Sequence, residues 1–148
     1  MEKINFHLVT PERTLLNKEL LSLSCPTEMG QITVLPGHVP LVANLVPGEM
    51  VAKSENGDEY IHVSGGFIQV NPQRQVIVLA DAAEHGYEID IKKTEEAVLR
   101  AKQALLETHA SSEEYARVAA SLERSLTKLN VARKRTHKRG APLTSEGV

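Results

Sequence analysis

The stretch EYIHVSGGFIQV, residues 59–70, decides the fold of the first part of the chain. Ile61 and Val63 share one face of an extended backbone, and polar groups alternate with them on the other face. After the glycine pair at 65 and 66, residues 67–70 alternate again. Alternation on both sides of a glycine turn predicts two short β-strands, each buried on one face.

The same period of two recurs from residue 4 to about residue 83, in short runs. The run 76–79 is apolar on both faces, as is typical of an inner strand. Turn signals separate the runs at intervals of roughly 8–12 residues: Thr10-Pro11, Pro36-Gly37, Pro47-Gly48, Asn56-Gly57, Gly65-Gly66 and Asn71-Pro72. Asn56-Gly57 is the strongest hairpin signal among them. Evenly spaced strands without helices between them predict an N-terminal all-β antiparallel sandwich or flattened barrel.

From about Glu88 onward the apolar residues follow the period of a helix. The first stripe contains Ile91, Thr94, Val98, Ala101 and Leu105. Ser111 and Glu114 match a capping box, which predicts the start of a second helix. That helix has an apolar side formed by Tyr115, Val118, Ala119, Leu122, Leu126 and Leu129. Two amphipathic helices joined by a short connector predict a C-terminal antiparallel two-helix hairpin.

The pattern therefore divides the chain into three segments. We expect a β-sandwich over residues 1–86, the hairpin over 87–137, and a disordered tail over 138–148, which lacks an apolar period. Two helices bury only one seam, so the hairpin is expected to lie on the sandwich, on a partner, or to move between them.

The charge differs between the two parts of the chain. Residues 1–91 hold five Lys or Arg against twelve Asp or Glu, whereas residues 92–148 hold twelve Lys or Arg against seven Glu. Such an asymmetry indicates two segments with different roles.

No pattern indicates catalysis or a bound metal. The six histidines are scattered without ligand spacing, and there is no GxSxG, GxxxxGK or GxGxxG motif. Ser64-Gly65-Gly66 is interpreted as a tight turn, and Cys25 as a buried small apolar residue. We predict no catalytic residue, no metal site and no resident cofactor.

The chain has neither a signal-peptide pattern at its N-terminus nor an apolar run near the roughly 20 residues of a membrane span. We therefore expect a cytosolic protein, or one peripheral on the cytosolic side of a larger assembly.

His38 lies between two prolines, in the string Pro36-Gly37-His38-Val39-Pro40. The sequence offers it no partner for acid–base chemistry, and Pro-Gly before it predicts a tight turn. A histidine at a rigid loop tip is expected to be a contact residue.

Residues 128–139 carry six positive charges and no acidic residue. The helix dipole accounts for one or two cations at a helix C-terminus, so six indicate an acidic partner. Nucleic acid, anionic lipid and an acidic protein surface are the alternatives. The acidic first part of the chain and its scarcity of aromatic residues count against nucleic acid.

With these elements in place, the chain resembles the epsilon subunit of bacterial F-type, proton-transporting ATP synthases over about residues 4–136. The resemblance rests on four ordered motifs: VTP at 9–11, MGQITVLPGHVPL at 29–41, YIHVSGGF at 60–67 and VIVLADAA at 76–83.

This resemblance implies a noncatalytic central-stalk subunit that is peripheral on the cytoplasmic face of the bacterial cell membrane. The implied partners are the gamma subunit, the ring of membrane-embedded c subunits, and acidic segments of the catalytic beta subunits, with no nucleic acid. A free-standing module that binds nucleic acid or anionic lipid through the basic C-terminus is the alternative.

The resemblance also implies roles for individual residues. Glu28, Gln31 and His38 become candidate contacts with the ring or the shaft, in a family that often has Glu where this chain has Gln31. The expected inhibitory contacts, which would hold an extended hairpin and restrain ATP hydrolysis, are Arg124, Lys128, Arg133, Lys134 and Arg135.

Some members of this family bind a regulatory ATP through the motif Ile/Leu-Asp-x-x-Arg-Ala at the start of the first helix. Here Ile89 and Asp90 are present, but Lys93 replaces Arg and Thr94 replaces Ala. Lysine keeps the charge and loses the planar fork of the guanidinium. Nucleotide binding by Asp90 and Lys93 is therefore one expectation, and a helix N-cap at Asp90 is the other.

Overall fold

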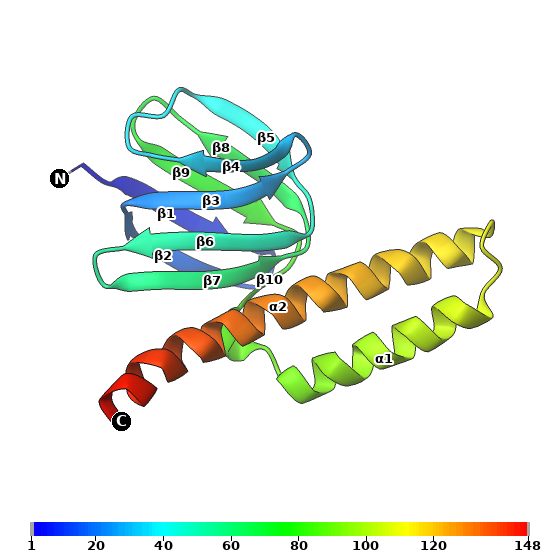
Figure 1. Ribbon diagram of the computed structural model, residues 1–148. Helices are drawn as coiled ribbons and strands as arrows, with labels where there is room; N and C mark the ends of the chain where they lie inside the picture. The colour runs from blue at the N-terminus through cyan, green and yellow to red at the C-terminus, as the bar shows by residue number, and fades with distance from the viewer. Residues whose placement is uncertain (1, 148) are drawn as a thin grey trace. The chain divides into compact units, whose positions relative to one another are not determined.

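The computed structural model describes the backbone of residues 2–147 and the side chains of residues 2–134. The chain separates into two compact units, Met1–His85 and Gly86–Val148. The first unit is built of strands and the second of helices (Figure 1).

The first unit contains ten strands. They are β1 (Ile4–Val9), β2 (Thr14–Leu20), β3 (Ser22–Thr27), β4 (Gly30–Val34), β5 (Leu41–Leu45), β6 (Gly48–Ser54), β7 (Gly57–Val63), β8 (Gly66–Val70), β9 (Gln75–Ala80) and β10 (Ala83–His85). Their order in the sheet is β10-β7-β6-β3-β5-β8-β9-β1-β2, with β4 paired to β3.

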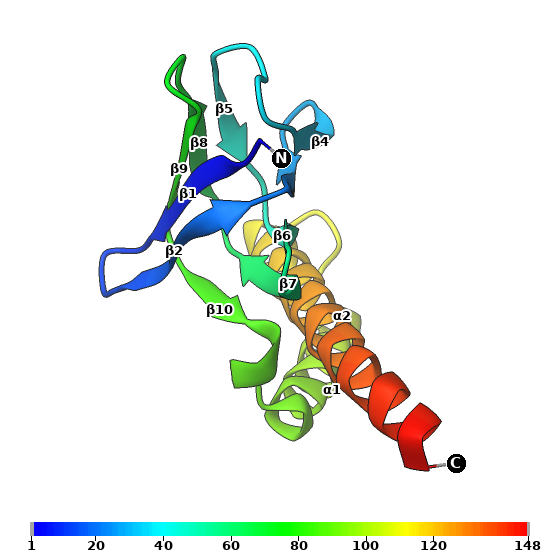
Figure 2. The same ribbon diagram turned by 90° about the vertical axis from the view of Figure 1, so that its left-hand side faces the viewer.

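The sheet folds over into two layers, with β8 and β9 in one layer and β6 and β7 in the other (Figure 2). This confirms the predicted β-sandwich. Every strand pair is antiparallel except β1 with β9, which is parallel. The exception arises because β1 comes from the start of the chain and inserts between β9 and β2, without a hairpin turn to reverse its direction relative to β9.

The stretch 59–70 forms β7, a turn and β8, as predicted. Ile61, Val63 and Ile68 are fully buried, and Val70 is 4% exposed. The same inward positions of the other strands complete one core; its largest members are Phe6, Ile4, Leu8, Leu20, Leu23 and Met50. Cys25 lies in this core, as predicted, and burial raises the pKa of its thiol to about 12.

The glycine pair makes the turn between β7 and β8. Gly65 and Gly66 have φ of +129° and +127°, values that L side chains rarely adopt. A Cβ on Gly66 would stand 2.1 Å from the carbonyl oxygen of Leu79, so β8 and β9 approach more closely there than any side chain allows.

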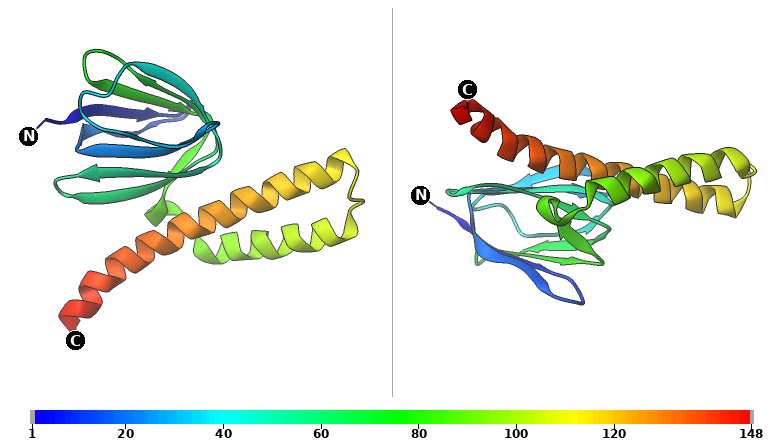
Figure 3. Two further views of the ribbon diagram at one scale, coloured as in Figure 1. Left: turned by 45° about the horizontal axis from the view of Figure 1, so that its top comes forward. Right: turned by 90° about the horizontal axis from the view of Figure 1, so that it is seen from below.

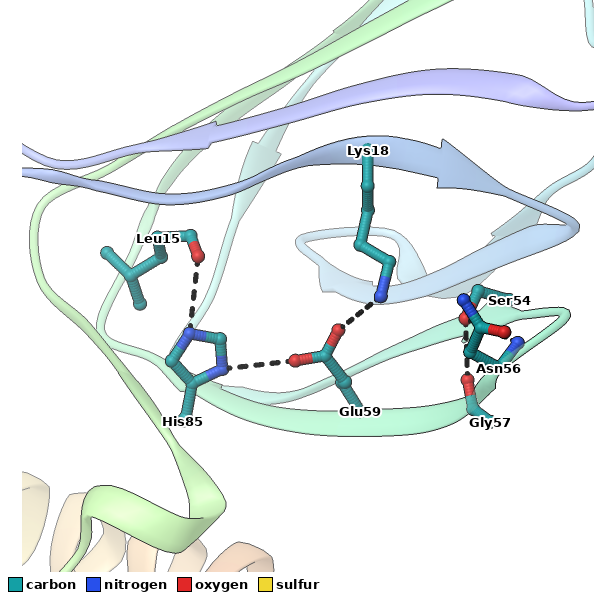
Figure 4. Close-up of polar contacts among 7 residues, drawn as sticks. All are labelled: Leu15, Lys18, Ser54, Asn56, Gly57, Glu59 and His85. Carbon is teal, nitrogen blue, oxygen red and sulfur yellow. Dashed lines mark hydrogen bonds and ion pairs between the residues drawn. The ribbon is translucent and has the colours of Figure 1, made fainter.

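The predicted hairpin at Asn56-Gly57 joins β6 to β7. Its two loop residues are Glu55 and Asn56, while Gly57, with φ of +121°, begins β7 opposite Ser54. The hydroxyl of Ser54 donates to the carbonyl oxygen of Gly57 over 3.0 Å (Figure 4).

A polar cluster connects the two ends of the strand order, β2 and β10. The ring Nε2 of His85 donates to the carbonyl oxygen of Leu15 at 3.3 Å, and its Nδ1 lies 3.6 Å from a carboxylate oxygen of Glu59 (Figure 4). Lys18 binds the other oxygen of Glu59 at 2.9 Å. These contacts draw β2 towards β7 and β10, so the cluster nearly closes the sandwich into a barrel.

The second unit begins with a 3₁₀ turn, η1 (Gly86–Glu88), followed by α1 (Ile91–Glu107) and α2 (Glu113–Gly147). Figure 3 shows α1 and α2 running side by side from a short connector, which is the predicted helical hairpin. Thr94 and Val98 of the predicted stripe are buried, and Leu129 is buried on α2.

Two details of the hairpin differ from the sequence analysis. Ser112, and not Ser111, caps α2: its hydroxyl accepts the backbone N–H of Tyr115 at 3.0 Å, whereas the Ser111 hydroxyl contacts the His109 ring at 2.9 Å. Residues 138–147 continue α2 where a disordered tail was predicted. The prediction relied on the missing apolar period, but the backbone hydrogen bonds of a helix do not require one.

We predict that Gly66→Ala destabilises the sandwich far more than Gly57→Ala. Both residues have strained φ, but a Cβ at Gly57 meets nothing within 4 Å. Strain alone costs about 1–3 kcal/mol, and the collision with Leu79 adds about 1–3 kcal/mol. Urea unfolding measures both free energies. Equal losses for the two variants would mean that β8 and β9 do not approach as closely as described.

We also predict that Glu59→Gln lowers the free energy of unfolding by about 1 kcal/mol, because Lys18 loses its charged hydrogen-bond acceptor and the carboxylate beside the buried His85 is removed. Glu55→Gln is the matched control, since it removes an ion pair with Lys3 that is exposed and should leave the stability nearly unchanged. If both variants unfold at the same urea concentration as the unmodified chain, the cluster does not hold the sandwich closed.

Candidate functional site

The outer face of the layer containing β5, β8, β9 and β1 carries an apolar patch. In the strand register, Phe67 lies opposite Leu79, and Leu79 lies opposite Val9. In the next row, Gln69 of β8 lies between Val42 of β5 on one side and Ile77 of β9 on the other. We call the set Val9, Val42, Phe67, Ile77 and Leu79 the outer apolar patch.

The patch is accessible. Val42 is 70% exposed, Leu79 41% and Phe67 40%, while Val9 and Ile77 are half-buried. Neighbouring apolar side chains that are left exposed on a stiff sheet indicate a surface for another protein.

The sequence analysis missed this patch. It interpreted the run 76–79 as the interior of the sheet because both faces are apolar, and β9 is indeed an inner strand between β8 and β1. Only Val76 and Val78 point into the core; Leu79 points outward and is exposed. The available signal was that Val42 and Phe67 also fall at outward positions of their strands.

Glu28 and Gln31 lie at the tip of the β3–β4 hairpin. The hydroxyl of Thr27 donates to the carbonyl oxygen of Gly30 at 2.5 Å and accepts the N–H of Met29 at 3.2 Å, which fixes the two-residue loop. Glu28 and Gln31 are exposed there, and Met29 between them is 87% exposed.

His38 lies in the loop between β4 and β5. Its backbone N–H donates to the carbonyl oxygen of Leu35 at 3.0 Å, and its ring Nδ1 lies 2.7 Å from the carbonyl oxygen of Val39. These contacts form the tight turn that the sequence predicted. The loop and the β8–β9 turn line a pocket of about 300 Å³, to which Val39, Asn71 and Pro72 contribute.

The structure does not bring these three contact candidates together. The backbone N–H of Glu28 donates to Asn44 near the end of β5, whereas His38 comes before the first residue of β5. The five-residue strand β4 separates the hairpin tip from the His38 loop by roughly 13 Å. The candidates therefore mark two ends of one edge of the sandwich.

The basic candidates lie along α2. Arg124 and Lys134 are exposed, and Lys128 is half-buried. Arg133 donates from Nη2 to a carboxylate oxygen of Glu95 on α1 at 2.8 Å. Arg135 lies outside the residues whose side chains are described.

Asp90 is the N-cap of α1, which was one of the two roles expected for it. Its carboxylate accepts the backbone N–H of Lys93 at 3.0 Å, and its carbonyl oxygen accepts the hydroxyl of the buried Thr94 at 2.8 Å. These contacts account for Asp90 without a nucleotide. The Lys93 side chain is exposed.

Within the described residues, no three His, Cys, Asp or Glu side chains gather closely enough to hold a metal ion. No helix in that part of the chain has both the length and the apolar character to cross a bilayer.

Comparison with known families matches both units. Residues 3–86 match the β-sandwich domain of the ATP synthase delta/epsilon chain, and residues 88–133 match its long α-helix domain. The chain belongs to this family of ATP synthase subunits. The family is that of a noncatalytic stalk subunit, so the prediction that the chain is not itself an enzyme is confirmed.

Bacterial relatives match along almost their whole length. The ATP synthase epsilon chain of Dehalococcoides mccartyi is 38% identical over 135 residues, which cover 91% of this chain and 96% of the relative. That of Bacillus pumilus is 35% identical over 134 residues, covering 90% and 100%. The predicted resemblance is thereby confirmed.

Solved ATP synthases contain the same fold. A chain in the OSCP/F1/c-ring structure of the Euglena gracilis mitochondrial enzyme superposes with a TM-score of 0.74 at 25% identity, over 84% of this chain and 78% of that one. A chain from the central stalk and c-ring of the Tetrahymena thermophila enzyme, with a TM-score of 0.55 at 17% identity over 91% and 97%, shares the fold alone.

Proposed function

We propose that the chain is a rotor subunit of an F-type ATP synthase that couples ring rotation to ATP synthesis and restrains ATP hydrolysis through its helical hairpin. In this proposal it is peripheral at the cytoplasmic face of a bacterial cell membrane. The observation that carries the proposal is the outer apolar patch on a stiff sandwich, in a chain of this family.

The β unit serves as the mechanical coupling. A close-packed sandwich deforms little under load, and the closely approaching strands β8 and β9 lie directly beneath the patch. We assign the outer apolar patch to the gamma shaft, because burial of exposed Val42, Phe67 and Leu79 would stabilise a permanent contact.

The edge that carries Glu28, Gln31 and His38 is assigned to the c ring. Its side chains are exposed or half-buried at two fixed turns, and Met29 and Val39 add exposed apolar contacts at each end. A rigid turn binds without first being ordered, which lowers the entropic cost of association.

The hairpin serves as the regulatory element. In its extended form, the cations of α2 bind acidic segments of the catalytic beta subunits. Each exposed pair contributes only about 0.2–1 kcal/mol, but Arg124, Lys128, Arg133, Lys134 and Arg135 together can bias a balanced equilibrium.

We predict that Val42→Asp weakens the association of the full chain with its gamma partner at least about tenfold, because a carboxylate would be buried without a counter-charge. The fold should tolerate the change, since Val42 is 70% exposed. Asn56→Asp introduces the same charge at an exposed hairpin loop and is the control. Unchanged affinity for both variants in a binding titration would exclude the patch as the shaft contact.

Deletion of residues 88–148 should raise ATP hydrolysis by the reconstituted complex, because the inhibitory element is lost while the β unit keeps its own core. Replacement of the five α2 cations by Gln should reproduce part of this increase. The assay compares hydrolysis rates at several nucleotide concentrations. An unchanged rate after the deletion under every condition would overturn the regulatory role, and would leave the coupling role standing.

A further inference from the structure

We call the hairpin closed when α1 and α2 lie side by side, as they do in this structure. In the closed hairpin, one of the cations expected to bind a partner already forms an ion pair within the chain. Arg133 on α2 donates from Nη2 to Oε2 of Glu95 on α1 at 2.8 Å, a charge-assisted hydrogen bond of good length. The two side chains are 59% and 48% exposed, so solvent screens the pair, and its strength is that of a surface ion pair.

The pair lies at the open end of the hairpin. The connector that joins the helices follows Glu107, whereas Glu95 lies near the first residue of α1, Ile91. Thirteen residues of chain separate Glu95 from Thr108, which corresponds to roughly 20 Å along a helix axis. Separation of α2 from α1 about the connector therefore has to break this contact.

The apolar seam beside the pair is short. On α1 only Thr94 and Val98 are buried, and Ala101 and Leu105 further along are half-buried. Leu129, Val131 and Ala132 are the buried α2 residues next to Arg133. Because a small seam stabilises the closed hairpin only modestly, one ion pair is a significant fraction of the total.

We propose that Glu95 is a latch residue, which stabilises the closed hairpin through Arg133 and in that state withholds Arg133 from an acidic protein partner. The inference rests on the proposed function, in which Arg133 binds that partner when the hairpin extends. Extension of the hairpin separates α2 from α1, so Arg133 has to leave Glu95 before it binds the partner's carboxylate in the extended state. Closing and inhibition therefore compete for one side chain.

The test measures hairpin opening in the isolated full chain. Val98→Cys places a thiol on the buried stripe of α1, where it reacts with a soluble thiol reagent only when the hairpin opens. The native Cys25 does not interfere, because it is buried and its pKa is raised to about 12. The labelling rate of Val98→Cys then reports the fraction of open hairpin.

Glu95→Gln in the Val98→Cys background should label about two- to fivefold faster, as expected for the loss of a surface ion pair. Glu96→Gln is the matched control: it is the next residue of α1, is exposed, and has no ion pair among the described side chains. The double variant Glu95→Arg/Arg133→Glu restores the pair with reversed charges and should return the rate to that of the Val98→Cys parent.

Equal labelling rates for Glu95→Gln and Glu96→Gln would overturn the latch, and so would a charge-reversed variant that labels as fast as Glu95→Gln. ATP hydrolysis by the reconstituted complex is the second measurement, in which Glu95→Gln should inhibit more strongly than the unmodified chain. Faster labelling with unchanged hydrolysis would support the contact between the two helices and overturn the step in which it withholds Arg133, whereas the deletion of residues 88–148 tests the regulatory role separately.

Discussion

The burial of one face of each strand is the constraint on which the β unit depends. Because successive side chains point to opposite faces, the residues that fill the core fix the direction of all the others. Val76 and Val78 enter the core, so Leu79 must face outward, beside Phe67. Core packing thus decides which residues form the outer apolar patch. Because these outward-facing residues are apolar, we infer that the patch binds another protein.

Closure of the sandwich depends on polar contacts at one seam. The strand order ends in β2 and β10, and the cluster of Lys18, Glu59 and His85 brings these ends together. His85 is also the last residue of the β unit, immediately before η1. The strand from which the helical unit continues is therefore anchored in the seam, through backbone pairing with β7 and through the His85 side chain.

The helical unit depends less on apolar burial than the β unit does. Its apolar seam is short, and the largely exposed Leu99 and Leu106 add little to it. A hairpin of this kind gains stability from a few caps and pairs, such as the Asp90 and Ser112 caps and the Glu95–Arg133 contact. Elements with so little buried area are the ones expected to change conformation when a partner offers an alternative.

The sequence by itself determined the two periods, the strands on either side of the glycine pair, the helical hairpin and the family, because alternation, helical stripes and turn residues are local properties of the chain. It did not predict the parallel pairing of β1 with β9, the roughly 13 Å separation of the Glu28 tip from the His38 loop across β4, or the use of Ser112 in place of Ser111 as a cap. Tertiary structure alone decided which apolar residues stay exposed and which cation meets Glu95. Those outcomes depend on strand register and helix pairing, which join residues far apart in the chain and are set by the packing of the whole unit.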